Sequence, residues 1–191
     1  MRRIYGMIAA SLALTAAIAL TRSQQRPERF GFGTPATAAE IRRADTDVRP
    51  DGHGLPHDSG TVAAGGVIYK KQCALCHGAT GIEGPFDKLV GRAPKDSFAF
   101  GRDPKLLGTR TIGNYWPYAT TLYDFINRAM PQNAPGSLAP RDVYSVVAFL
   151  LYRNEIIPAT MTVSDRTLPK VVMPAHGRFV VDDRSKSRVV K

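Results

Sequence analysis

The sequence has few cysteines, few acidic residues and no surplus of hydrophobic residues. Two cysteines among 191 residues cannot form a scaffold of several disulfides. Hydrophobic residues make up 43% and charged residues 22%, which excludes a mainly disordered chain and a multi-span membrane protein. With 16 acidic against 26 basic residues, the formal net charge is +10. The 14 prolines and 17 glycines indicate that part of the chain forms loops or linkers.

The N-terminus has the layout of an export signal. Two arginines precede sixteen uncharged residues, 4–19, that are rich in Ala, Leu and Ile. Ala17 and Ala19 are small residues where a signal peptidase reads the chain, which predicts cleavage after Ala19. The alternative is an uncleaved anchor, although sixteen helical residues span only about 24 Å of a hydrocarbon core of about 30 Å. We therefore expect residues 1–19 to be a signal peptide or N-terminal anchor, and the rest to be exported.

The remainder of the chain divides into three parts. Residues 20–60 lack helical or strand periodicity and carry many Gly, Pro and charged residues, which is typical of a linker or arm; a short helix is expected over 36–43. Residues 61–157 hold the cysteines and the strong helical patterns, and we expect one domain there. Residues 158–191 form a C-terminal extension with a basic end. It is either a solvated tail or, at 168–174, a segment that covers a partner.

Two helices are predicted near the two ends of the 61–157 domain. The second spans 141–157, with Pro140 in its first turn. A glycine inside a helix costs about 1 kcal/mol against alanine, so Gly66 predicts a close crossing of the two helices, with Phe149 as its partner. The first helix has one stripe at helical spacing that runs into the cysteines: Val62, Gly66, Tyr69 and Cys73.

The most specific motif is Cys73-Ala74-Leu75-Cys76-His77, the C-x-x-C-H signature of covalent haem attachment. Two thiols at this spacing can reach both vinyl groups on one porphyrin edge, and the adjacent histidine then lies under the iron. A redox-active C-x-x-C would need a βαβ pattern, and a zinc site two further ligands at matching spacing; the sequence has neither. We expect Cys73 and Cys76 to bind one haem c covalently and His77 to coordinate its iron.

A methionine is expected as the second axial ligand. Met130-Pro131 follows a predicted helix that opens at a capping box over 121–124. Because proline ends the helix and leaves the methionine on a fixed loop, Met130 is the first candidate. A thioether ligand raises the reduction potential and suits electron transfer rather than oxygen activation. The predicted helix has three apolar residues on one face: Leu122, Phe125 and Ile126. The alternative ligands are the other methionines and histidines of the exported chain: Met161, Met173, His53, His57 and His176.

This set of motifs resembles class I cytochrome c over residues 61–157. The motif residues are Gly66, Tyr69, Cys73 to Gly78, Gly84-Pro85, Met130-Pro131 and the helix over 143–151. The resemblance implies an all-α fold around one haem, with irregular N- and C-terminal extensions. It also implies that the Pro85 carbonyl orients the His77 imidazole.

Further segments, 114–124, 128–131, 133–138 and 168–174, are similar to the cytochrome subunit of Sox-type sulfane and sulfite dehydrogenases. That resemblance implies a periplasmic cytochrome that accepts electrons from a molybdenum-cofactor subunit and passes them to a downstream cytochrome. Some members carry two haem domains, whereas this sequence has one C-x-x-C-H. The particular dehydrogenase and its sulfur substrate therefore stay open.

Aromatic residues cluster before the predicted ligand. Tyr115, Trp116 and Tyr118 are expected in the wall of the haem pocket, where their N–H and O–H groups are candidate donors to the propionates. Arg92 and Arg110 are candidate cations for the same groups.

The positive charge favours an acidic redox partner, because complementary charges steer short-lived encounters. Nucleic acid is not expected as a partner, because the charge is scattered rather than gathered in a binding module and the chain is expected to be exported. An anionic membrane surface is the alternative if an anchor is retained. Three function classes follow: a redox subunit of a molybdenum dehydrogenase, an independent cytochrome c that shuttles electrons to a terminal oxidase, or an enzyme or gas sensor with an open axial position. A Met130 ligand would exclude the third, so we expect an electron carrier without catalytic residues.

Overall fold

The structure, a computed structural model, describes residues 32–91 and 110–180. The chain divides into two compact units, Met1–Ala44 and Asp45–Lys191. The predicted signal or anchor over 1–19 and the candidate Arg92 lie outside the described residues. Within the described ranges, no helix has the length and apolar character needed to cross a membrane.

The described part of the first unit contains one short helix, α2 (Ala38–Ala44). Thr37 and Glu40 cap it reciprocally: Glu40 N donates to Thr37 Oγ1 (3.2 Å), and Thr37 N donates to the Glu40 carboxylate (2.7 Å). These bonds lower the pKa of Glu40. No residue of α2 is buried. The helix expected over 36–43 is thus confirmed with slightly shifted bounds.

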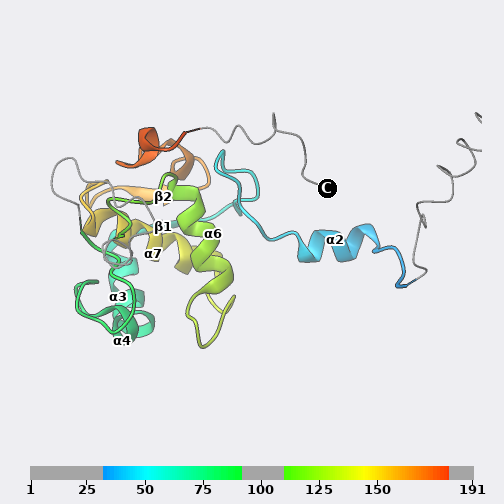
Figure 1. Cartoon of the computed structure of the whole chain (residues 1–191), viewed down its shortest axis with the longest axis horizontal. Coiled ribbons are helices and arrows are strands. Elements are labelled where there is room, and N and C mark those ends of the chain that lie inside the picture. The colour runs from blue at the N-terminus through cyan, green and yellow to red at the C-terminus, as the bar shows by residue number, and fades with distance from the viewer. Residues whose placement is uncertain (1–31, 92–109, 181–191) are drawn as a thin grey trace, which may run out of the picture. The chain divides into compact units, whose positions relative to one another are not determined.

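In the residues that the structure describes, the second unit combines four helices with a two-stranded ribbon (Figure 1). The ribbon pairs β1 and β2 antiparallel, with Gly60 opposite Val163. In chain order the elements are β1 (Ser59–Thr61), α3 (Val62–Gln72), α4 (Ala74–His77), α6 (Ala119–Ala129), α7 (Pro140–Arg153), β2 (Thr162–Ser164) and the 3₁₀ turns η1 (Leu168–Lys170) and η2 (His176–Arg178). The predicted all-α architecture is confirmed, with the short ribbon as an addition.

Helix α7 carries the centre of the core. Its apolar residues at helical spacing are buried as predicted: Val143, Val146, Val147, Leu150 and Leu151. Pro140 occupies the first turn, also as predicted. The helix ends at Arg153, before the expected end at 157, because Asn154 caps it and Glu155 follows in the left-handed region with φ of 56°.

Helices α3 and α7 cross at glycine, but the closest contact is one residue earlier than predicted. A Cβ on Gly65 would lie 1.8 Å from the Ser145 carbonyl oxygen, whereas a Cβ on Gly66 would lie 3.3 Å from the Phe149 ring. The predicted crossing is therefore confirmed, and Gly65 rather than Gly66 sets the backbone distance.

The start of α6 differs from the prediction. The helix begins at Ala119, so Thr121 lies inside it, and Thr121 Oγ1 donates to the Tyr118 carbonyl (2.8 Å). Asp124 accepts from Val48 N (2.8 Å) and pairs with Arg128 instead of closing a capping box. Burial opposes ionisation of Asp124, but these donors outweigh it and lower its pKa. The capping box over 121–124 was therefore a wrong prediction.

One residue of the predicted apolar face of α6 is not buried. Leu122 and Ile126 lie in the core as expected, whereas Phe125 is 43% exposed. Its ring packs edge-on against Trp116, with centroids 5.7 Å apart.

Segments expected to flank the domain contribute to its core. Val48, Leu168 and Met173 are buried among the helices, and Val163 of β2 is fully buried. The boundaries predicted at residues 60 and 157 therefore do not coincide with the limits of the packed core.

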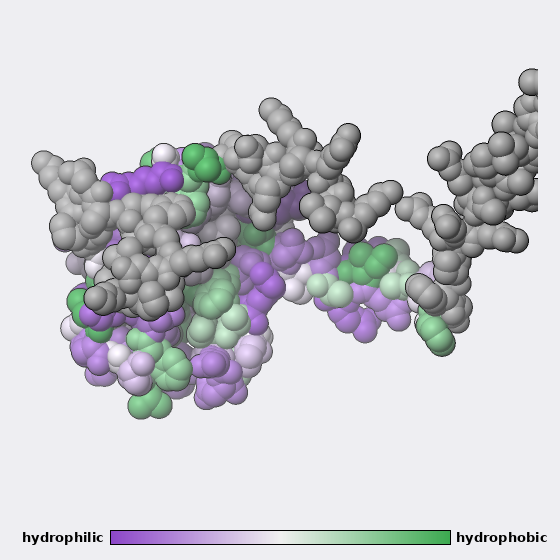
Figure 2. Space-filling model, viewed as in Figure 1, coloured by the Kyte–Doolittle hydropathy of each residue, from purple (hydrophilic) through white to green (hydrophobic). Residues whose placement is uncertain are grey.

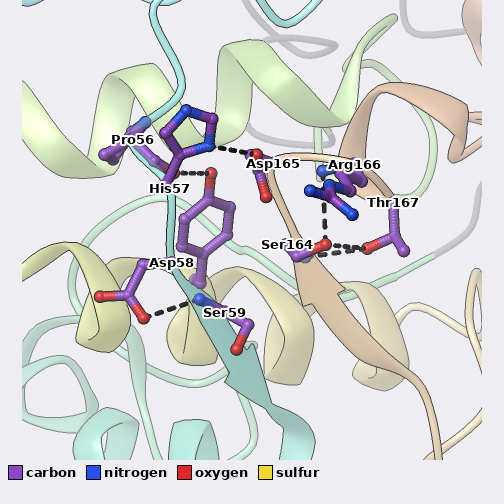
Figure 3. A network of polar contacts seen from close by, with 9 residues as sticks. Pro56, His57, Asp58, Ser59, Ser164, Asp165, Arg166 and Thr167 are labelled. Carbon is purple, nitrogen blue, oxygen red and sulfur yellow. Dashed lines mark hydrogen bonds and ion pairs between the residues drawn. The ribbon is translucent and has the colours of Figure 1, made fainter.

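A polar network ties these two flanking segments together (Figure 3). His57 Nδ1 lies 2.7 Å from the Asp165 carboxylate. The Tyr144 hydroxyl donates to the Pro56 carbonyl (2.9 Å), and Ser164 N donates to Thr167 Oγ1 (2.8 Å). The network joins the entry into β1 to the turn that follows β2.

Candidate functional site: a haem-attachment motif on a short helix

The two cysteines of the motif lie on one helical turn. Cys73 is the N-terminal cap of α4, and Cys76 follows within it. Both are free and partly buried. Burial, with the neighbouring Cys76 adding to the shift, raises the pKa of the Cys73 thiol to about 11. Cysteines of redox-active C-x-x-C sites have a lowered thiol pKa, so this environment does not favour that alternative.

The imidazole of His77 is oriented by a backbone carbonyl. His77 Nδ1 lies 2.8 Å from the Asp87 carbonyl oxygen. Because a carbonyl oxygen only accepts, Nδ1 carries the hydrogen and the Nε2 lone pair is available to a metal. The resemblance implied that the Pro85 carbonyl has this role; the structure assigns it to Asp87, two residues further on.

The loop after His77 explains this shift. The Glu83 carboxylate accepts from Thr80 Oγ1 (2.6 Å), Thr80 N (3.1 Å) and Ile82 N (3.0 Å), which closes a tight turn. A Cβ on Gly84 would lie 2.2 Å from the Cys76 carbonyl oxygen, so the backbone passes directly against the motif at that point. Phe86 N donates to the same Cys76 carbonyl (3.1 Å). The chain is therefore still packed on α4 at Pro85, and Asp87 is the residue that faces the imidazole.

Tyr69 fastens the beginning of this loop to α3. Its hydroxyl donates to the Gly78 carbonyl (2.9 Å), and its ring lies 5.1 Å from that of Phe149. Burial raises the pKa of Tyr69 to about 12, so the hydroxyl remains a donor throughout the neutral range. Gly78 itself has φ of 84°, a conformation that favours glycine directly after the histidine.

Met130 lies on a separate element. It caps the C-terminus of α6, where its N–H donates to the Ile126 carbonyl (3.1 Å). It is partly buried against the same hydrophobic core that Cys73 and Trp116 contact. In the view of Figure 1, α4 and the loop after α6 lie at the same end of the second unit.

The alternative ligands have other surroundings. Met173 is 2% exposed within the core, and Met161 packs against the edge of that core. His57 is bonded to Asp165, and His176 Nδ1 lies 3.2 Å from the Pro117 carbonyl oxygen. Met173 thus has the environment of a core residue, and the two histidines each have a hydrogen-bond partner, Asp165 and the Pro117 carbonyl.

The aromatic residues expected in the pocket wall lie in the segment before α6. Trp116 contacts Phe125, Tyr118 contacts His176 (ring centroids 5.0 Å apart), and the Arg110 guanidinium lies 4.4 Å above the Tyr115 ring. Figure 2 shows hydrophobic residues, in green, interspersed with hydrophilic ones where α4 and α6 lie in Figure 1. The exposed large residues there include Leu75 at 91% and Phe86 at 52%.

The donor set fits a covalently bound haem. It offers two free thiols two residues apart, an imidazole whose tautomer leaves Nε2 available, and a thioether on a second helix. In the described parts of the chain, no group of three or more His, Cys, Asp or Glu side chains could hold a metal ion by itself.

Comparison with known proteins gave one family match and one structural match. A family model described as cytochrome c oxidase, cbb3-type, subunit III matches residues 60–150. A chain in the crystal structure of the sulfane dehydrogenase SoxCD from Paracoccus pantotrophus matches with a TM-score of 0.68 and 36% identity, covering 84% of this chain and 76% of that chain. The comparison with curated proteins gave no match.

The chain belongs to the class I cytochrome c family, whose members bind haem c covalently and transfer electrons. Within that family it is similar to a chain of the sulfane dehydrogenase SoxCD. The fold and the family resemblance predicted from the sequence are therefore confirmed. Sequence reasoning missed Asp87 because a backbone carbonyl leaves no signature in residue type.

Proposed function

We propose that this chain is a periplasmic cytochrome c with one haem, and that it is the electron-accepting subunit of a molybdenum sulfite or sulfane dehydrogenase. The observation that carries the proposal is the 36% identity over 84% of the chain with a chain of the sulfane dehydrogenase SoxCD. That match extends well beyond residues 60–150, the part shared with the general family model. The signal-like sequence over 1–19 supports export to the periplasm.

The chain's own residues hold and tune the cofactor. When haem c is bound, Cys73 and Cys76 would attach it covalently, His77 would coordinate the iron through Nε2, and Met130 would supply a thioether ligand. When bound, haem c supplies a one-electron couple between ferric and ferrous iron. The Asp87 carbonyl fixes the His77 ring and increases the basicity of its Nε2, while the Met130 thioether favours the reduced state.

The surface around α4 is suited to exchange electrons with a partner. Leu75 lies between the two cysteines and is 91% exposed, and Lys70 and Lys71 stand in the last turn of α3 just before the motif. An exposed apolar residue with two lysines nearby in the chain fits an acidic partner, because charge complementarity accelerates encounters. This chain binds the partner and holds the haem that accepts the electrons, while the substrate is oxidised on the molybdenum subunit.

The axial ligand is tested by replacing Met130. In the holoprotein, we expect Met130→Ala to abolish the ligand-field absorption band of methionine-bound ferric iron and to lower the reduction potential, because the thioether that stabilises the reduced state is lost. Met161→Ala is the matched control and leaves both unchanged. Loss of the band in the Met161 variant instead would reassign the ligand.

The partner is tested by metal analysis. The full chain, tagged and purified under mild conditions from the cells that make it, is expected to retain molybdenum in a fixed ratio to haem iron. An absence of molybdenum, together with direct reoxidation by a terminal oxidase, would favour the alternative of an independent electron shuttle. The family model that matches residues 60–150 is described for a subunit of a cytochrome c oxidase, so domains of this type also serve terminal oxidases.

A further inference from the structure

Asn154 is a buried amide that contacts the loop carrying the histidine's hydrogen-bond partner. It caps α7 and is 2% exposed. Its Nδ2 donates to the Leu150 carbonyl (2.8 Å) and to the Leu89 carbonyl (3.1 Å), and its Oδ1 accepts from Gly91 N (3.1 Å). Both of its N–H groups and its oxygen are engaged, so the orientation of the amide is fully determined by its partners.

The segment held by Asn154 begins two residues after Asp87. Leu89 N donates to the Gly81 carbonyl (2.8 Å), and the Leu89 carbonyl also accepts from Ile112 N (3.2 Å). Gly91 in turn accepts a bond from Thr111 Oγ1 through its carbonyl. The amide is thus the contact through which the end of α7 holds residues 89–91.

Gly113 closes the other side of this contact. A Cβ at Gly113 would lie 2.7 Å from Asn154 Oδ1 and 2.8 Å from the Gly91 carbonyl oxygen. Any side chain at position 113 would therefore displace either the amide or the loop. Two residues distant in sequence from the C-x-x-C-H motif converge on the same short segment.

We propose that Asn154 is a positioning residue for the proximal iron ligand. Its amide fixes residues 89–91, and through them the Asp87 carbonyl that orients His77. Asn154 touches neither His77 nor the cofactor, and it acts only through the loop. This inference rests on the proposed role of His77 as the iron ligand.

The test uses the holoprotein with Asn154→Leu, which keeps side-chain volume but removes all three bonds. We expect the His77 Nδ1 hydrogen, followed by NMR, to exchange with solvent about tenfold faster, as the loss of a buried hydrogen bond implies. We also expect the reduction potential to rise, because a looser Nδ1 bond makes the imidazole a weaker donor.

Tyr144→Phe is the matched control. Tyr144 lies on the same helix, and this substitution removes one partly buried hydrogen bond, from its hydroxyl to the carbonyl of Pro56 in a segment other than residues 89–91. Gly113→Ala disturbs the same contact from the opposite side and is expected to reproduce the effect of Asn154→Leu. If Asn154→Leu does not fold, Gly113→Ala alone tests whether this contact positions His77.

Equal exchange rates and potentials in the Asn154, Gly113 and Tyr144 variants would overturn the proposal. The proposed function would then still stand, provided that the wild-type spectrum has the signature of histidine-ligated haem c. A wild-type spectrum without that signature would instead refute the proposed function.

Discussion

Glu83 is a solvent-exposed carboxylate with a structural role. It accepts bonds from Thr80 and Ile82, and these bonds lower its pKa to about 2 from an ordinary value of 4.5. A carboxylate with a lowered pKa stabilises the fold above its unfolded pKa and loses that contribution as the pH falls through its folded pKa. Glu83 is therefore expected to stabilise the loop after His77 at neutral pH and to release it in acid.

This sets a pH window for Glu83→Gln. At pH 7 the variant is expected to unfold at a lower denaturant concentration than the wild type. The difference should shrink as the pH falls from about 4.5 towards about 2, because the wild-type carboxylate then becomes protonated. Glu40→Gln serves as control, because it removes another carboxylate with a lowered pKa, but one on a helix that has no buried residues. A pH-independent difference for Glu83→Gln would contradict the assignment.

At the scale of residues, the sequence predicts roles for side chains with distinctive chemistry but not for their backbone partners. Residue type and spacing alone predict that Cys73 and Cys76 attach the haem and that His77 coordinates its iron. The Asp87 carbonyl has no such signature, since its position depends on the Glu83 turn and on Asn154, 67 residues away in sequence. The family resemblance implied the Pro85 carbonyl, but the turn closed by Glu83 places the carbonyl of Asp87, two residues later, next to the His77 imidazole.

At the scale of elements, the crossing of α3 and α7 depends on one glycine. A Cβ at Gly65 would meet the Ser145 backbone at 1.8 Å, and backbone cannot move aside as a side chain can. The neighbouring Gly66 faces only the Phe149 ring at 3.3 Å. The same substitution at these adjacent positions should therefore have different effects on stability.

Gly65→Ala is expected to destabilise the protein by about 3 kcal/mol, the upper range for overpacking. Gly66→Ala is expected to be neutral or to stabilise by up to about 1 kcal/mol, because alanine is the better helix former and the Phe149 ring can shift slightly. Chemical denaturation of the two holoproteins measures both. Similar losses for the two variants would show that the helices do not cross at Gly65 as described.

The helical periods were predictable because a buried stripe repeats along the sequence, as in α7. The start of α6 was not, since Asp124 has the residue type of a capping box but bonds to Val48 and Arg128 instead. Phe125 fits the apolar face by spacing, yet it points to Trp116 at the surface. Tertiary packing therefore determines whether such side chains contact local or long-range partners.

At the scale of the whole molecule, the core uses chain on both sides of the helical region. Val48, Leu168 and Met173 stand in short, proline-containing segments, and no helical or strand period identifies them as buried. Their burial becomes clear only once β1 and β2 pair and bring residues 45–60 and 162–175 onto α6 and α7.

The net charge of +10 leads to a prediction for association. The rate at which an acidic redox partner reduces the cytochrome is expected to fall as ionic strength rises, since the screening length shrinks from about 10 Å at 0.1 M to about 3 Å at 1 M. Stopped-flow reduction across this range measures it, with a small uncharged reductant as control. If reduction by the partner were as insensitive to salt as reduction by the control, charge steering would not contribute to association.

The proposed role as the electron-accepting subunit of a molybdenum dehydrogenase is tested most directly by reducing the cytochrome through its partner. The complex purified from the cells that make this chain is kept anaerobic, sulfite or a sulfane sulfur compound is added, and the absorption of reduced haem c is recorded. We predict that the ferrous spectrum develops with substrate and that molybdenum is required. A haem that stays oxidised with every such substrate, while a chemical reductant reduces it fully, would contradict the claim.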